Sequence, residues 1–209
     1  MLRKRPRRFT TLIVALIVSA LALTGCAGMS MTGEEFSRAI NGVTGTMSTY
    51  NEESQVIDRV DGVSFRFARD DRFDTHNSEG SNKDSAVVMI SLGDSHIFHV
   101  GSTMIFAQDG IVNVAGQLPD EVRFSDTVTG TPWLNDIRER FGNLWQGKAK
   151  TIMVRSQNGT PLAVFAGNAV ETFATDIPKS TAFRVDGKYL LVYRADYTVY
   201  DNTLLQRAR

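Results

Sequence analysis

Short runs of apolar, β-branched residues alternate with turn-forming pairs along most of the chain beyond residue 50. At four places an Asp-Gly or Asn-Gly pair separates two such runs: Asp61-Gly62, Asp109-Gly110, Asn158-Gly159 and Asp186-Gly187. These pairs adopt the positive φ angles of type I′ turns, whose twist matches that of two paired strands. Each pair therefore predicts a β-hairpin, and together they predict an antiparallel β architecture.

The pattern within two segments shows how strands would be buried. Over residues 63–68 apolar and polar or small side chains alternate, as in a strand with one buried face. Residues 87–90 are apolar at every position, which indicates a central strand buried on both faces. Residues 69–84 between them are polar and predict a loop.

One segment has helical rather than strand periodicity. Thr131 suits the N-cap of a helix, Pro132 its first turn and Gly147 its end. Apolar side chains between them recur at helical spacing: Trp133, Leu134, Ile137, Phe141, Leu144 and Trp145. We expect an amphipathic helix over residues 131–146, with its apolar face packed against the sheet.

A shorter helix is predicted near the N-terminus. Residues 32–35 (Thr-Gly-Glu-Glu) have the pattern of a capping box, and Phe36, Ala39 and Ile40 would share one helix face. We therefore expect a mainly β (α+β) fold, either a sandwich or a partly closed barrel built from hairpins. It would comprise an N-terminal segment over residues 1–25, a tether with this short helix over residues 26–50, and a single β domain over residues 51–209.

The first 25 residues have the layout of a secretory signal peptide. Five basic residues lie among positions 3–8, without an acidic residue, and residues 12–23 are almost wholly apolar. The apolar run is about a dozen residues long, whereas a membrane-spanning helix needs about 20. A basic region, an apolar region and small residues in this order predict export of the chain.

The end of this segment, Leu23-Thr24-Gly25-Cys26, resembles a bacterial lipobox. The resemblance implies cleavage between Gly25 and Cys26 and a diacylglycerol thioether on Cys26, the only cysteine in the chain. A thiolate is the nucleophile such lipidation needs, and two acyl chains anchor a protein stably where one does not. The alternative is an ordinary signal anchor with an incidental cysteine.

Charge and cysteine content exclude several classes of function. The chain has 23 basic and 23 acidic residues. Because five of the basic and none of the acidic residues precede Cys26, the remainder carries 18 basic and 23 acidic residues. A mildly acidic chain without a basic run does not suit nucleic-acid binding. Once Cys26 is lipidated, no thiol remains for a disulfide, a nucleophile or a metal site.

Four segments resemble an uncharacterised lipoprotein family of Gram-positive bacteria, known only as a domain of unknown function. These are residues 65–74, 99–103, 162–168 and 186–205, within a similarity that extends from about Glu34 to Leu205. The resemblance implies a lipoprotein on the extracytoplasmic face of the cell membrane. It implies no activity, and the lipid-bearing Cys26 is the only site residue it transfers.

Several side-chain groups raise the question of catalysis or metal binding. His96 and His99 would lie on opposite faces of a strand. Ser102 near His99 and Asp94 lacks the Gly-x-Ser-x-Gly turn of a nucleophile elbow. Four acidic residues of the polar loop do not follow the spacing of an EF-hand: Asp70, Asp71, Asp74 and Asp84. We therefore assign no catalytic, cofactor-binding or metal-binding residue.

The aromatic residues leave two interpretations open. Trp133 and Trp145 would either pack the predicted helix onto the sheet or stack on a sugar ring, and packing is favoured. The tail tyrosines would be strand residues or line a ligand groove: Tyr189, Tyr193, Tyr197 and Tyr200.

We expect a lipid-anchored, non-catalytic binding or scaffold module at the outer face of the membrane. The partners would be the membrane itself and an envelope polymer, an exported solute or a membrane protein, and no nucleic acid. The alternative is a cell-wall-directed hydrolase with a carboxylate-based site, because two carboxylates can be brought together from distant strands.

Overall fold

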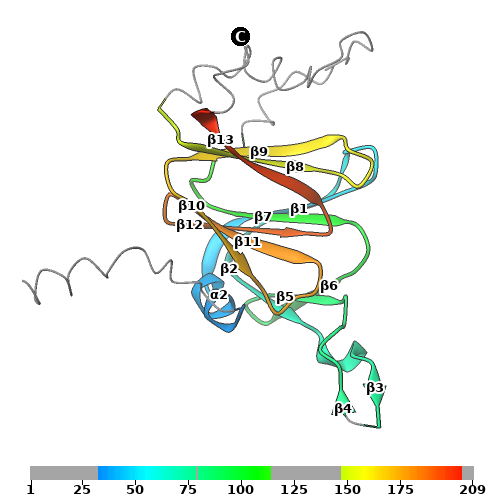
Figure 1. Ribbon diagram of the computed structural model, residues 1–209. Coiled ribbons are helices and arrows are strands. Elements are labelled where there is room, and N and C mark those ends of the chain that lie inside the picture. Colours follow the sequence, from blue (N-terminus) through cyan, green and yellow to red (C-terminus); the bar gives the residue numbers. More distant parts are fainter. Residues whose placement is uncertain (1–32, 79, 114–146, 204–209) are drawn as a thin grey trace, which may run out of the picture. The chain divides into compact units, whose positions relative to one another are not determined.

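The computed structural model describes residues 33–78, 80–113 and 147–203, most of which form antiparallel strands (Figure 1). The helices are α2 (Gly33–Ile40) and the 3₁₀ helix η1 (Asp71–Phe73). The strands are β1 (Val43–Tyr50), β2 (Val56–Arg69), β3 (His76–Asn77), β4 (Gly80–Ser81), β5 (Val88–Leu92), β6 (Ser95–His99), β7 (Thr103–Gln108), β8 (Lys150–Arg155), β9 (Pro161–Gly167), β10 (Val170–Ala174), β11 (Ser180–Val185), β12 (Lys188–Tyr193) and β13 (Asp196–Asp201).

The strands form two main sheets. The larger has eight strands in the order β10-β11-β12-β7-β1-β2-β5-β6, and the smaller has three in the order β13-β8-β9. Every pairing within them is antiparallel. Both orders have two ends, so among the described residues neither sheet closes on itself. The expected mainly antiparallel fold is confirmed, in its sandwich rather than its barrel form.

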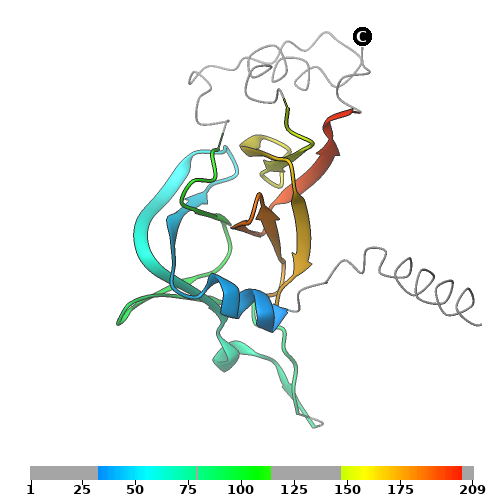
Figure 2. The ribbon, with the colours of Figure 1, turned by 90° about the vertical axis from the view of Figure 1, so that its left-hand side faces the viewer.

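Strand β7 illustrates how the larger sheet separates two apolar cores. Met104 and Phe106 on one face join a buried cluster that contains Phe36 and Ile40 of α2. Ile105 on the other face joins a second buried cluster together with residues of β8 and β9. Figures 1 and 2 accordingly show α2 on one side of the larger sheet and the smaller sheet on the other. Because successive side chains of a strand point to opposite faces, β7 is buried on both of its faces.

Strand β2 differs from the prediction, because Asp61-Gly62 does not form a turn. Both residues lie inside one 14-residue strand that pairs first with β1 and then with β5. A β-bulge interrupts the pairing with β1, and Ser64 there has a φ of 67°. A Cβ atom on Gly62 would lie 2.8 Å from Leu92 Cδ2. This glycine therefore permits close packing rather than chain reversal.

Of the other three predicted hairpins, two are confirmed and one is wrong. Asn158-Gly159 joins β8 to β9, and Asp186-Gly187 joins β11 to β12. Asp186 and Gly187 have φ angles of 48° and 83°, as a type I′ turn requires. The chain does turn at Asp109-Gly110, but it does not return along β7. Instead Asn113 forms an isolated bridge to Phe165 of β9.

The N-terminal part of the described chain is more fully incorporated than expected. The short helix is present as α2, with Phe36 and Ile40 buried. Residues 43–50, which we placed in the tether, form β1 between β7 and β2 of the larger sheet. This segment joins the sheet because the apolar side chain of Met47 belongs to the buried core. The strands therefore begin before residue 51.

The polar segment 69–84 is also more ordered than a loop. It contains η1 and the small hairpin of β3 and β4, which together form an arm at one end of β2 and β5 (Figure 1). The predicted segment 87–90 corresponds to β5, an interior strand between β2 and β6. Outside the described residues lie the predicted helix 131–146, the signal segment 1–25 and Thr32 of the capping box.

Candidate functional site

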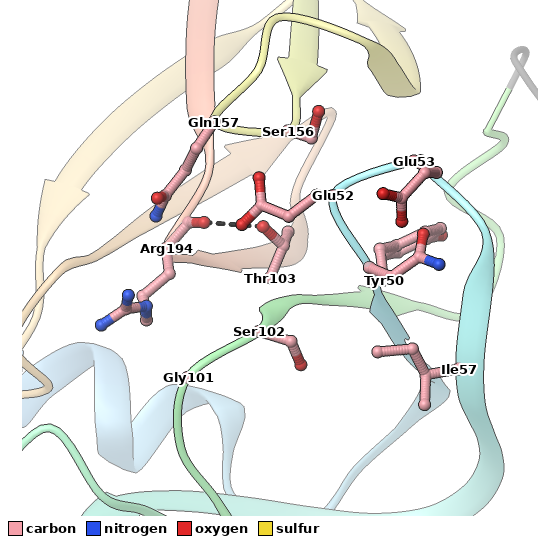
Figure 3. Close-up of a pocket in the computed structure, with 11 residues that line it drawn as sticks. Tyr50, Glu52, Glu53, Ile57, Gly101, Ser102, Thr103, Ser156, Gln157 and Arg194 are labelled. Atoms are coloured by element: carbon pink, nitrogen blue, oxygen red, sulfur yellow. Dashed lines mark hydrogen bonds between the residues drawn. The ribbon is translucent and has the colours of Figure 1, made fainter.

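A cavity of about 400 Å³ opens where four connecting segments meet (Figure 3). These are the β1–β2 turn, the segment before β7, the β8–β9 turn and the corner between β12 and β13. The lining residues are Tyr50, Asn51, Glu52, Glu53, Ile57, Gly101, Ser102, Thr103, Ser156, Gln157 and Arg194. The volume lies within the range of about 300–1,000 Å³ that is usual for small-molecule sites.

One wall of the cavity is the β1–β2 turn, which carries Glu52 and Glu53. Asn51 shapes this turn, because its Oδ1 accepts a 2.8 Å hydrogen bond from the Gln55 backbone amide. The side-chain amide of Asn158, in the β8–β9 turn, donates to the Glu52 carbonyl. The turn is therefore fixed to the other sheet. The carboxylates of Glu52 and Glu53 are exposed, and the backbone that carries them is fixed by these hydrogen bonds.

The other wall is the corner at Arg194, where the chain passes from the larger sheet to the smaller one. Arg194 has a φ of 52°, and its amide donates to the Lys179 carbonyl at 2.9 Å. Thr103 Oγ1 donates to the Arg194 carbonyl at 2.7 Å. The Arg194 Nε is buried and has no hydrogen-bond partner among the described residues. In Figure 3 the guanidinium lies across the cavity from Glu53.

Between these walls the cavity is lined by two serines and by apolar surface, and the Ser156 hydroxyl donates to Asn158 Oδ1 within its own turn. Ser156 is held by a 2.8 Å hydrogen bond from its amide to the Thr160 carbonyl, and Ser102 lies on the opposite side in Figure 3. Tyr50 and Ile57 add apolar surface near Glu53. Burial raises the pKa of the Tyr50 hydroxyl, so this group stays neutral and acts as a hydrogen-bonding group at physiological pH.

The arrangement suits binding of a polar ligand. It combines two carboxylates, one guanidinium and several hydroxyl and amide groups on turns that side-chain hydrogen bonds hold in place. A few convergent polar groups in a concavity are the usual mark of a ligand site. Burial raises the pKa of the Tyr193 hydroxyl next to Arg194, and the charge of Arg194 partly opposes this shift.

The histidines that the sequence suggested are placed apart from one another. His96 Nδ1 contacts Ser91 Oγ at 3.0 Å, whereas His99 Nε2 contacts the Ser102 carbonyl at 2.9 Å, on the other face of β6. His99 therefore meets the backbone of Ser102 with the nitrogen that a triad would use. Within the described parts of the chain, no group of three or more His, Cys, Asp or Glu side chains could hold a metal ion.

Three acidic residues of segment 69–84 bond to protein donors, namely Asp70, Asp74 and Asp84. Asp70 forms a bidentate pair with Arg72, at 2.9 Å from Nε and 2.6 Å from Nη2, and this pair lowers the Asp70 pKa. The buried Asp74 lies 3.3 Å from Arg69 Nη1 and accepts from the Ser85 amide at 2.9 Å. These contacts shape the base of the arm.

The tail tyrosines are strand residues. Tyr193 is fully buried, and its hydroxyl donates to the Ala86 carbonyl at 2.6 Å. Tyr189 packs edge-on against Phe36, and Tyr197 against Phe183. The Tyr200 hydroxyl accepts from Arg155. None of the four lines the cavity. Cys26, Gly25, Trp133 and Trp145 lie outside the described residues.

The cavity residues were not identified from the sequence. Glu52, Glu53 and Arg194 belong to no spaced motif, and Arg194 follows Glu52 by well over a hundred positions. Only the fold brings the turns that carry them together. The one local signal was the polar Asn51–Gln55 stretch between two apolar runs, which marks a turn without indicating a site.

Fold and site thus define the class, an antiparallel β-sandwich domain with a polar cavity framed by its turns. The chain belongs to a family described as a domain of unknown function (DUF5052), whose profile matches residues 7–205. The comparisons with curated proteins and with solved structures found no match. In the described part of the chain, no helix has the length and apolarity needed to cross a membrane.

Proposed function

We propose that this protein is a lipid-anchored binding module at the extracytoplasmic face of the cell membrane, held by Cys26, with the cavity as its binding site. The observation that carries the binding role is the convergence of Glu52, Glu53 and Arg194 on a cavity of about 400 Å³. The lipobox-like Leu23–Cys26 segment supports the anchor.

The framing of the cavity favours binding over catalysis. Its turns are fixed by Asn51, Thr103 and Asn158 through hydrogen bonds to backbone groups. His99, a candidate general base, instead contacts a backbone carbonyl. A preformed site binds without paying the conformational entropy of ordering its own loops.

The anchor can be tested by metabolic labelling with radioactive palmitate. We expect label in the wild-type chain and none in Cys26→Ala, because the thiol is the acceptor of the lipid. We also expect the variant to leave the membrane fraction. Label in Cys26→Ala would show that the anchor lies elsewhere or does not exist.

Binding can be tested with the full chain in detergent and purified cell-wall fragments. We expect stoichiometric retention of the protein without release of soluble products. The alternative is a hydrolase that uses Glu52 and Glu53, which both line the cavity. Repeated release of sugars or peptides that Glu52→Gln or Glu53→Gln abolishes would favour that alternative and overturn the non-catalytic role.

A further inference from the structure

The two walls of the cavity carry opposite charge. Glu52 and Glu53 lie on the β1–β2 turn, whereas Arg194 lies at the β12–β13 corner, and Figure 3 shows the Arg194 guanidinium and the Glu53 carboxylate on opposite sides. Among the described residues, no ion pair includes any of these three side chains. The site therefore presents its negative and positive groups separately and not as an internal salt bridge.

Arg194 has the features of a receptor for a carboxylate. A guanidinium presents a planar set of donors that matches the two oxygens of a carboxylate. Its Nε is buried without a partner in the described structure. Because this atom has no exposed surface, a ligand in the cavity would be bound by the other guanidinium nitrogens and not by Nε. The hydrogen bonds of its own amide and carbonyl fix the backbone at this corner.

The opposite wall suits an ammonium group, which has three donors and no acceptor. A ligand with only a positive charge would leave the charge of Arg194 without a partner. A neutral sugar would leave the charges of both walls without partners. Between the walls, Ser102 and Gln157 offer groups that can hydrogen bond to a peptide unit, and Tyr50 and Ile57 offer apolar surface.

On this basis we propose that the cavity binds a zwitterion of the amino-acid type, namely an amino acid or short peptide with a free ammonium and a free carboxylate. The carboxylate would contact Arg194, and the ammonium would contact Glu52 and Glu53. This proposal rests on the proposed function, since it identifies the ligand of the same cavity.

The test is calorimetric titration of the full chain in detergent with three forms of one peptide. The probes are alanylalanine, its N-acetyl derivative and its C-terminal amide. We expect alanylalanine to bind, and each blocked form to bind at least about tenfold more weakly, because a hydrogen-bonded charge pair is lost. Alanylalanine is tested as its L,L and its D,D form, and binding of either form supports the proposal. Preference for L,L would indicate an exported peptide, and preference for D,D a wall peptide.

Variants assign the two ends of the ligand. We expect Arg194→Gln to bind alanylalanine as weakly as the wild type binds the amide, without discriminating between the two. The double variant Glu52→Gln/Glu53→Gln should likewise no longer discriminate against the N-acetyl form. Matched controls are Arg38→Gln and Glu34→Gln, an exposed pair on α2, which should bind as the wild type does. Arg194→Lys, which keeps the charge at this corner, should retain intermediate affinity.

Three results would overturn the proposal: no binding of alanylalanine, equal binding of all three forms, or unchanged discrimination in folded Arg194→Gln. Thermal unfolding of each variant establishes that it is folded. If wall fragments are retained while alanylalanine is not bound, the ligand class is wrong and the binding role stands. If neither is bound, the proposed function fails as well.

Discussion

At the scale of single residues, unfavourable backbone conformations coincide with turns, corners and the β-bulge of β2. Ser54, Ser64, Lys179, Asp186 and Arg194 all have positive φ, which costs an L-residue about 1–2 kcal/mol. Ser54 and Arg194 belong to segments that frame the cavity. Only Asp186 could be predicted, because Asp-Gly marks its turn, whereas Arg and Ser do not indicate a left-handed backbone.

Asp186 also fixes a neighbouring connection. Its Oδ1 accepts from the Asn168 and Ala169 amides at 2.7 and 2.9 Å, and its Oδ2 lies 3.0 Å from Lys148 Nζ. The Ala169 hydrogen bond and then Lys148 lower the pKa of this carboxyl below its ordinary 3.8. A carboxyl with a lowered pKa in the folded state stabilises it above the ordinary pKa. This contribution is lost as the pH falls through the lowered value.

We predict that Asp186→Asn lowers the free energy of unfolding at pH 7 by at most about 1 kcal/mol, since the site is partly exposed and screened. Asn tolerates the same positive φ, so the turn is kept. The deficit should shrink as the pH falls below the pKa of the folded state. Urea denaturation at several pH values measures it, with Asp94→Asn in the β5–β6 turn as the control. A deficit independent of pH would contradict this account.

At the scale of elements, strand β2 shows why a local turn signal can fail. Asp61-Gly62 has the residues of a hairpin turn, but Gly62 pairs with Gly45 of β1, so two glycines face each other where the strands approach closely. Both have close neighbours at the Cβ position. The same residue type thus serves a reversal at Gly187 and close packing at Gly62. The partner strand, which the local sequence does not specify, decides between them.

Gly45 provides the test of this close packing. A Cβ atom there would lie 2.4 Å from the Ala107 carbonyl oxygen and 2.7 Å from the Phe106 ring. We predict that Gly45→Ala destabilises the fold by about 1–3 kcal/mol, as overpacking of a core does. Chemical denaturation measures the loss, and Thr44→Ser, which adds no atom to the same strand, is the control. A variant as stable as the wild type would show that β1 and β7 are not packed so closely.

At the scale of the whole molecule, the two sheets are joined by the corners and turns that also frame the cavity. Asn158 links them directly, because its side-chain amide donates to the Glu52 carbonyl. Its Oδ1 also accepts from the Thr160 amide at 3.1 Å. The sequence predicted strands, two of the hairpins and a sandwich, because these follow from local alternation and turn residues. It did not predict the cavity, because packing between distant turns creates it.

Asn158→Asp removes the donor of this link and keeps the acceptor. We predict a loss of about 1 kcal/mol in the free energy of unfolding, the usual contribution of one hydrogen bond. We also predict weaker ligand binding, since the β1–β2 turn is released from the β8–β9 turn. Gln157→Glu adds the same charge in the same turn and is the matched control for stability. Equal losses in the two variants would attribute the effect to charge and not to the link.

The late position of β12 in the chain has a consequence for how the protein folds. Strand β7 pairs on one side with β1, which is synthesised earlier, and on the other with β12, which is synthesised nearly last. The hydrogen bond of Tyr193 to the Ala86 carbonyl spans 107 residues. Contacts of such separation form slowly, and until they form the edge of β7 is open to pairing with another chain. The nascent protein therefore depends on the β11–β12 hairpin to cover the edge of β7 and so to prevent aggregation. A chain cut short before β12 would lack this protection permanently.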